Sequence, residues 1–597
     1  MRRRPTAVLS AIALTCVAAC GASPPAPAAT PLAATATSPS TPAAWAPVAV
    51  RTAALEPAGG SRLGRLAFPI TGSAECQRNF AEGMLALHSF LYDQAHVSFA
   101  AGLAADPKCA MAAWGDAMAY DKAIWDDRDL AKGRAALGRV SGEEALTPKE
   151  RAFLRVARAD YEKDLTSEAH AAWLAAAAAM HGDYPDDDEV TLQYALSLLS
   201  SYGYDDAHVR EQMEAGALAL QVLQHNPQHP GAAHYAIHAF DSPEHAILAL
   251  PAARVYARIA PAGSHALHMP SHIFVQLGMW RDVVPSNEQA YAASVAWEKS
   301  REHTPSEYDW HSYSWLVAAH LELGQRAAAR KLIDDAAALL VAAKDDSSEL
   351  RKNYLDTVTN YVTQTGRWGE LEAMIAPVFA TAFDEASTSG GRVACAMHAP
   401  GGKGTSRLPT VLIDRVDADL FRAEAAIRLG DEATAIKRMT EMKVLWAQTS
   451  LWKKVLPARM LQQRIAYGET LLIRAHGGPK PSAAAQKTGI EALENYVKQY
   501  PGGSVSGPAM TSPVGELLGE ALLAAGKPKE ALVQFEQVLG ARPNRALALL
   551  GAARAAKAAG DAEKARARYG ALAKLWKDSD ADLPELAEVK AGVERES

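Results

Sequence analysis

Six histidines crowd into one part of the chain and are predicted to bind a metal ion. They are His234, His238, His265, His268, His272 and His311. The first two are four residues apart, about 40° around a helix, so they share a face. The three in the segment 265–272 fall within roughly a 60° arc at ~100° per residue. Imidazole suits zinc, copper and iron, so two such stripes on adjacent helices predict a transition-metal site.

Two further residues are expected beside this set. Asp241 is predicted either to bind the ion or to hold a ring in place by a hydrogen bond, and Tyr235 is predicted to lie next to the ligands. Pro270 conflicts with a continuous helix, because a proline inside a helix frees a carbonyl near Ala266 and bends the axis. If a helix instead begins at Pro270, His265 would lie in a loop and the shared face would be lost.

Repeats predict the elements that position these residues. Gly83, Ala95, Phe99 and Pro107 have spacings that recur in Gly519, Ala531, Phe535 and Pro543. A further unit follows 34 residues later, at Ala565 and Tyr569. Four more inter-helix turns are predicted at Gly278, Gly324, Gly366 and Gly430. This pattern resembles the tetratricopeptide repeat and predicts an all-α solenoid of helix-turn-helix units from about residue 65 to 592.

The histidine segments also resemble a bacterial family of tetratricopeptide-repeat proteins, many of them secreted, that has no settled function. The resemblance is carried by His229-Pro230-Gly231-Ala232-Ala233-His234-Tyr235 and by His265-Ala266-Leu267-His268-Met269-Pro270-Ser271-His272-Ile273-Phe274. In such repeats the positions of the candidate ligands, and of His88, commonly line the concave face. The resemblance therefore implies a histidine-lined groove. The remaining histidines considered, His225, His229, His245 and His320, are interpreted as structural.

The N-terminus is predicted to direct the chain to a bacterial cell envelope. Three arginines precede a short apolar segment, and the sequence Val17-Ala18-Ala19-Cys20 resembles a lipobox. The resemblance implies removal of residues 1–19, acylation of Cys20 and, because Gly21 is not Asp, an outer-membrane anchor facing the periplasm. Residues 20–64 are rich in Ala, Pro and Thr and are predicted to form a disordered tether.

The remaining chain is divided by the repeat pattern into residues 65–345, with the histidines, and residues 346–592, with an insertion loop at about 387–409. Cys76 and Cys109 are one repeat apart, so a disulfide between them is predicted for an oxidising compartment. Two buried thiols are the alternative, and Cys395 is left over in either case.

Composition excludes several classes of protein. The 597 residues are 49% hydrophobic and 22% charged, which excludes a wholly disordered chain, a collagen and a polytopic membrane protein. A net charge of −7 argues against a nucleic-acid partner. Neither H-E-x-x-H nor G-x-S-x-G occurs, and no catalytic residue is assigned. Three functions stay open: a metal-binding protein with metal-dependent activity, a scaffold that binds a peptide or protein in its groove without metal, and a structural spacer.

Overall fold

The computed structural model describes the greater part of the chain beyond the predicted tether. The described residues are 62–125, 127–164, 166–202, 208–342, 348–380, 407–448, 466–473, 482–500, 507–508 and 513–594. They belong to one compact unit, Gly59–Ser597. The predicted signal peptide, Cys20 and Cys395 lie outside them, as do residues 387–406 of the predicted insertion loop.

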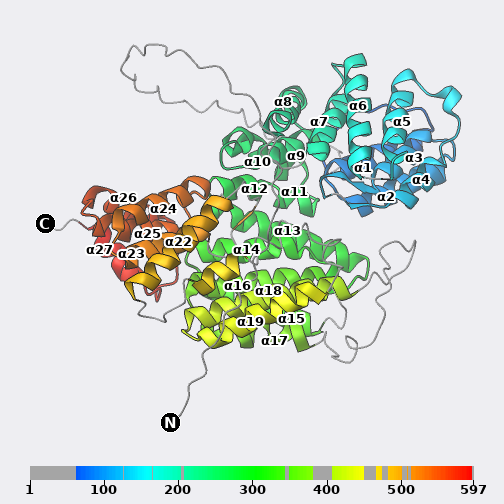
Figure 1. The fold of residues 1–597 in the computed structure, drawn as a ribbon. Helices are drawn as coiled ribbons and strands as arrows, with labels where there is room; N and C mark the ends of the chain where they lie inside the picture. Colours follow the sequence, from blue (N-terminus) through cyan, green and yellow to red (C-terminus); the bar gives the residue numbers. More distant parts are fainter. Residues whose placement is uncertain are drawn as a thin grey trace, which may run out of the picture. The chain divides into compact units, whose positions relative to one another are not determined.

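Helices follow one another along the first part of the described chain (Figure 1). They are α1 (Ala74–His88), α2 (Tyr92–Ala105), α3 (Ala110–Met118), α4 (Leu130–Leu137), α5 (Pro148–Tyr161), α6 (Thr166–Asp183), α7 (Asp188–Tyr202), α8 (Val209–His225), α9 (Pro230–Ala239), α10 (Ala246–Ile259), α11 (Ser264–His268), α12 (Pro270–Gln276), α13 (Trp280–Ser300), α14 (Trp310–Glu322) and α15 (Arg326–Ala342). Two short strands, β1 (Asp121–Lys122) and β2 (Asp127–Arg128), pair antiparallel between α3 and α4.

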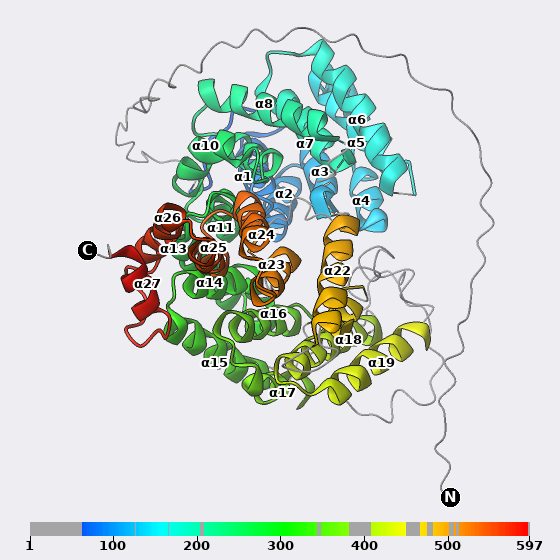
Figure 2. The same ribbon diagram turned by 60° about the vertical axis from the view of Figure 1, so that its left-hand side comes forward.

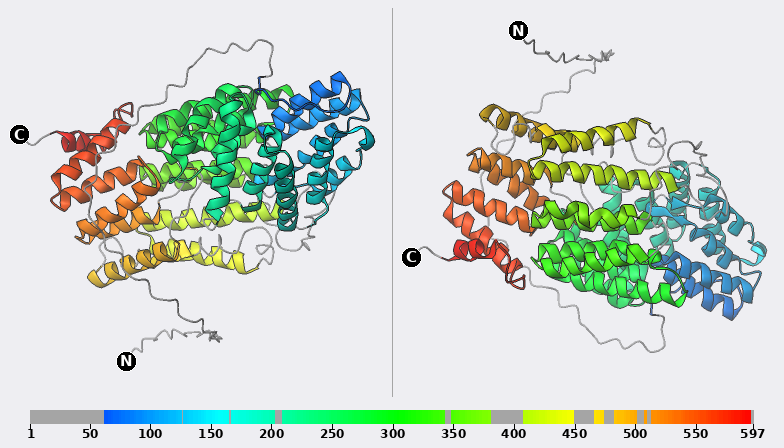
Figure 3. Two further views of the ribbon diagram at one scale, coloured as in Figure 1. Left: turned by 90° about the horizontal axis from the view of Figure 1, so that it is seen from above. Right: turned by 90° about the horizontal axis from the view of Figure 1, so that it is seen from below.

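The second part is built in the same way. Its helices are α16 (Ser348–Thr365), α17 (Leu371–Ala380), α18 (Arg407–Arg428), α19 (Glu432–Gln448), α22 (Ala483–Gln499), α23 (Val514–Ala524), α24 (Pro528–Ala541), α25 (Ala546–Ala558), α26 (Ala562–Leu575) and α27 (Leu586–Val593). Short 3-10 helices occupy Ala123–Trp125, Glu143–Ala145, Pro305–Glu307 and Trp368–Glu370. Figure 3 shows the helices side by side in antiparallel succession. The predicted all-α, tetratricopeptide-like solenoid is confirmed. Among the described helices, none is both long enough and apolar enough to span a membrane.

The repeat spacing reflects a close contact between paired helices. Phe99 and Phe535 are both buried. A Cβ atom built on Gly83 would lie 2.5 Å from the Phe99 ring, and one on Gly519 would lie 2.7 Å from the Phe535 ring. Each phenylalanine therefore fits only against a partner helix that carries no side chain at that point. Burying such a ring stabilises the hairpin by about 1.5–3 kcal/mol.

The start of the folded part differs slightly from the prediction. Leu63 is buried, and the backbone of Ala262 donates a hydrogen bond of 3.2 Å to the carbonyl of Arg62. The predicted tether therefore ends before Arg62 and not at residue 64. Near the predicted insertion, α18 already begins at Arg407, so the last three residues of that loop are helical.

A disulfide joins Cys76 in α1 to Cys109, the residue before α3. Both residues are fully buried, and their Cα atoms are 6.5 Å apart. The bond closes a loop of one helical repeat and links α1 to the hairpin that follows it. Such a link stabilises the fold mainly by restricting the unfolded chain.

The C-terminal hairpins contact more than their neighbours in sequence. They pack against the segment 278–326, more than 220 residues earlier (Figure 2). The side chain of Asn544 donates to the carbonyl of Gly278 at 3.1 Å, and the Trp280 indole donates to the carbonyl of Asn544 at 3.1 Å. Gly278 has a φ of +64°, and a Cβ atom there would lie 2.2 Å from the carbonyl oxygen of Pro543. Only glycine fits this turn.

A network of buried charged side chains stabilises this contact. The Arg545 guanidinium donates to Glu322 at 2.8 Å and to both carboxylate oxygens of Glu516. The second oxygen of Glu322 accepts the backbone N–H of Ala546 at 2.7 Å. The three charged side chains are 2–3% exposed, so each depends on the others for its charge and hydrogen bonds.

Arg545→Ala is expected to destabilise the protein by about 3–5 kcal/mol, because it leaves two buried carboxylates without their cation. The measurement is urea denaturation of the full chain followed by circular dichroism. Arg554→Ala is the matched control, since Arg554 pairs with Glu588 at the surface and its loss should cost less than about 1 kcal/mol. Equal shifts in the two variants would contradict the role given to the network.

Candidate metal centre

Four helices supply the six candidate ligands: α9, α11, α12 and α14. The helix break at Pro270 does not place His265 in a loop. α11 ends at His268 and α12 begins at Pro270, with Met269 between them in right-handed helical conformation. His265 and His268 are thus helical, and the prediction of a bend within a helical segment is the correct alternative.

Nearby hydroxyls satisfy carbonyls at the bend. The carbonyl of Leu267 accepts a hydrogen bond of 2.5 Å from Ser286, and that of His268 accepts one of 2.7 Å from Ser271. Serine side chains from α12 and α13 therefore stabilise the bend. It sets the direction of His268 relative to His272.

The structure brings the six rings together as two adjacent sets of three. The first set is His234, His238 and His265, and the second is His268, His272 and His311; within each, one nitrogen per ring lies within 4.8 Å of the others. The sequence placed all six on one face, and they are neighbours. They do not point at one spot, because the segment 265–272 divides between the two sets.

Distances within the sets suit a shared ion. In the first set, Nε2 of His234 is 3.0 Å from Nε2 of His238 and 3.1 Å from Nε2 of His265. In the second, Nε2 of His268 is 3.1 Å from Nε2 of His272. Two nitrogens bound to one ion at ~2.0–2.1 Å are roughly 2.9–3.4 Å apart for bond angles of ~90–110°.

The end of α1 orients His234. Phe90 has a φ of +53°, which ends the helix, and Leu91 N–H returns to the carbonyl of Ala86 at 2.9 Å. The carbonyl of His88, in the last helical turn, accepts Nδ1–H of His234 at 2.7 Å. In the neutral ring, Nε2 of His234 then carries a lone pair. The ring of Phe90 itself lies 4.3 Å from the ring of His234.

Side chains from two helices and a loop orient the second set. Nδ1 of His268 donates to Oδ1 of Asn287 at 2.6 Å, and the Asn287 amide in turn donates to the carbonyl of Val283. Nδ1 of His272 donates to Asp241 at 2.7 Å, and Gln276 donates to the other oxygen of Asp241 at 2.9 Å. Of the two roles predicted for Asp241, the structure places it behind a ring.

These hydrogen bonds decide where the protons are. A neutral imidazole has one N–H, and in both His268 and His272 it is on Nδ1. The two Nε2 atoms 3.1 Å apart therefore direct lone pairs at one another. Lone pairs at this distance repel unless a proton or a metal ion lies between them. Hydrogen bonds of this kind to the second ring nitrogen are typical of metal-binding histidines.

Burial favours the neutral form of His234, His238 and His268, which is the form that binds metal. Removal from water lowers the pKa of His234 to about 3 and lowers the pKa values of His238 and His268 well below the ordinary 6.5. The neighbouring histidines lower them further, because two positive rings so close would repel.

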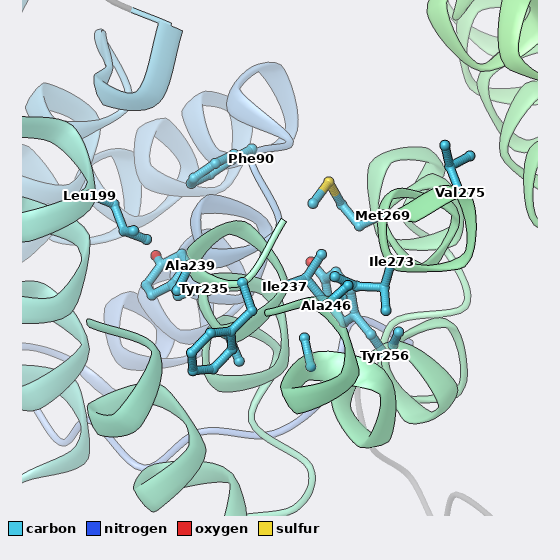
Figure 4. Packing of buried hydrophobic residues seen from close by; sticks show 14 of the residues in the cluster. Phe90, Leu199, Tyr235, Ile237, Ala239, Ala246, Tyr256, Met269, Ile273 and Val275 are labelled. Atoms are coloured by element: carbon cyan, nitrogen blue, oxygen red, sulfur yellow. The ribbon is translucent and has the colours of Figure 1, made fainter. Parts of the chain in front are cut away.

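Aromatic rings shield the two sets on separate sides. Phe90 lies 4.3–5.8 Å from the three rings of the first set, and Trp315 lies 4.5–5.2 Å from those of the second. Figure 4 shows Phe90, Tyr235 and Met269 among the buried side chains where these helices meet. Solvent reaches the sets through His311, which is exposed, and His265, which is partly buried.

A third group, behind the first set, is complete without an ion. Glu189 accepts from His88 at 2.9 Å and from His229 at 3.0 Å. The other nitrogen of His88 pairs with the Tyr235 hydroxyl at 2.9 Å. Each ring thus has a partner on both sides, since Ala232 N–H reaches His229. The structure places His88 in this network and not among the six ligands. The Tyr235 hydroxyl bonds His88, and the Tyr235 ring lies next to a candidate ligand as predicted, 5.7 Å from the ring of His234.

The glycine of the first histidine motif makes this network possible. A Cβ atom on Gly231 would lie 2.4 Å from Nδ1 of His88. No larger residue fits there without displacing His88, whose carbonyl holds His234. Two residues of this motif therefore act together: Gly231 leaves room for His88, and the carbonyl of His88 orients the candidate ligand His234.

A fourth group was not predicted from sequence. Asp121, Asp160 and His170 meet in the interior, with Arg128 3.4 Å from Asp160. No oxygen of the two carboxylates makes a hydrogen bond within the described part of the chain. Burial, and then the charge of Asp121, raise the pKa of Asp160 from 3.8 to about 7. The three polar residues come from a strand and two helices and have no common spacing, so no sequence pattern predicts that they meet.

Asp160→Asn is expected to stabilise the protein at alkaline pH. The folded state binds this proton more tightly than the unfolded chain does, so stability falls as pH rises from about 4 to about 7 and then levels off. Removing the charge should add about 1–3 kcal/mol at pH 8 and less at pH 5. Thermal unfolding at the two pH values measures it, with the exposed Asp127→Asn as control. An equal change at both pH values would refute the raised pKa.

Comparison with known proteins identifies the repeat near the C-terminus. Residues 522–591 match the tetratricopeptide repeat family. The matched range includes Ala531, Phe535, Ala565 and Tyr569, so the presence of a tetratricopeptide repeat in this region, as predicted, is confirmed. No curated protein matches the chain.

Solved structures similar to the chain include two at 12% sequence identity. The match to a human IFIT1 dimer with PPP-AAAA covers 84% of this chain and 90% of that chain, with a TM-score of 0.31. The match to yeast Tom70 covers 85% of this chain and 90% of that chain, with a TM-score of 0.30.

Proposed function

We propose that this protein is a tetratricopeptide-like envelope lipoprotein whose histidine cluster binds a transition metal: zinc, copper or iron. The observation that carries the proposal is the pair of Nε2 atoms on His268 and His272, which lie 3.1 Å apart while Nδ1 of each ring is hydrogen-bonded to Asn287 or Asp241. Zinc, copper and iron all accept imidazole ligands. Three rings around one ion leave a coordination position open, as metal-dependent activity requires.

Tetratricopeptide repeats are typical of scaffolds that bind proteins or peptides, since stacked hairpins supply an extended surface. The match at residues 522–591 favours this function for the C-terminal hairpins. A scaffold that binds a peptide or partner protein without metal is therefore the second candidate.

His268→Asn is expected to abolish binding of one metal ion. Asparagine keeps a polar atom near Asn287 and removes Nε2, so the change acts on the ligand and spares the hydrogen bond behind it. Elemental analysis of the purified full-length protein after incubation with zinc and desalting gives the metal content. We expect bound zinc in the parent and a loss of about one ion per chain in the variant.

His225→Ala is the control, because this ring is exposed and pairs with Asp188 outside the cluster. It should leave the zinc content unchanged. Circular dichroism establishes that both variants are folded. A parent protein that retains no zinc, copper or iron at neutral pH would overturn the metal proposal and leave the scaffold function.

Localisation rests on Cys20. We expect Cys20→Ala to move the protein from the outer-membrane fraction to the soluble periplasmic fraction, because acyl chains on this thiol would be the anchor. Fractionation with immunoblotting measures it, and Cys16→Ala is the control within the signal segment. Retention of Cys20→Ala in the membrane would refute lipid anchoring.

A further inference from the structure

We propose that the cluster is a paired-metal centre: the two sets of three histidines each hold one ion, and a small oxygen-donor anion such as hydroxide bridges the two ions. This inference rests on the proposed metal binding and adds the number of ions and the class of ligand between them. Three observations support it: the division of the rings into two sets, the short distance between the sets, and the charges around them.

The rings divide because one ion cannot reach all six. Ligand nitrogens at ~2.0–2.1 Å from an ion are at most about 4.2 Å from one another. The six rings form two groups of three, each within 4.8 Å, rather than one group of six. The division falls within α11, between His265, which lies with the rings of α9, and His268, which lies with His272 across the bend at Pro270.

The two sets nevertheless adjoin along their whole length. The ring centroids of His265 and His268 are 6.3 Å apart, and so are those of His238 and His272. Two ions bound to these sets would therefore be neighbours, with two pairs of rings side by side. Open positions of neighbouring ions allow one atom to bind both, as in two-metal sites.

The charge balance of two bound metal ions favours an anion in the site. All six ligands are neutral rings, so two divalent ions would bring four positive charges into a site without a carboxylate ligand. Asp241 is the carboxylate that contacts a ring, through His272. An oxygen-donor anion supplies the missing negative charge, and it can enter beside His311 and His265, the members of the cluster that are not fully buried.

The first test is the number of copper ions bound by the purified full-length protein. Copper(II) titration, desalting and elemental analysis should give two ions per chain. His311→Ala and His265→Ala should each give one, because each removes a ligand from a different set, and the control His225→Ala should give two. One ion in the parent would overturn the pairing and leave metal binding intact, whereas no ion would overturn both.

The second test concerns the bridge. Two copper(II) ions joined by one anion couple their spins, so the electron paramagnetic resonance signal of the parent should integrate to far less than two spins per chain. In His311→Ala and His265→Ala the remaining ion should give about one full spin. Two ions with a full two-spin signal in the parent would overturn the bridging anion. Both variants alter rings at the accessible edge, and circular dichroism identifies any that fail to fold.

Discussion

The position of one proton on each buried imidazole governs this site. Nδ1 of His234, His268 and His272 donates to a carbonyl, an amide oxygen and a carboxylate, respectively. Because a neutral ring has a single N–H, these three bonds leave the three Nε2 atoms as acceptors that face other histidines. Burial lowers the pKa values of His234 and His268 and so disfavours a second proton on these two rings. The network at Glu189 is different, because each of its rings has a donor or acceptor on both sides.

The solenoid positions these bonds through local exceptions to helix regularity. Phe90 adopts a left-handed conformation at the end of α1, which leaves the His88 carbonyl available to His234. Pro270 bends the segment between α11 and α12, and His268 and His272 lie on the two sides of this bend within one set. Gly231 lets α9 approach His88. Rule-breaking residues of this kind tend to mark functional sites, and here each has an identifiable effect on a ring.

Much of the fold could be predicted from spacing alone. The glycines at 278, 324, 366 and 430 all have the positive φ that an inter-helix turn favours, and the Phe99 and Phe535 positions bury rings in the same way. All six histidines could be assigned to one cluster, because residues three and four apart share a helix face. Their division into two sets could not, since His265 and His268 share α11 and the division depends on which rings of α9 and α14 lie beside each of them. The roles of Asn287 and Asp160 could not be predicted either, because neither residue shares a helix period with the groups that it contacts.

The contact between α14 and the C-terminal hairpins has a consequence for biosynthesis. A chain emerges from the ribosome, or crosses a membrane, with its N-terminal end first. Glu322 is then made long before Arg545 and Ala546, which donate to its carboxylate, and before Trp576, which donates to its backbone carbonyl. Until those residues emerge, this carboxylate must stay hydrated or be covered by a chaperone, since burying it without its cation is costly. The helix α14, which carries His311, therefore reaches its final packing only after the last hairpins are made, so this part of the site is completed late in synthesis.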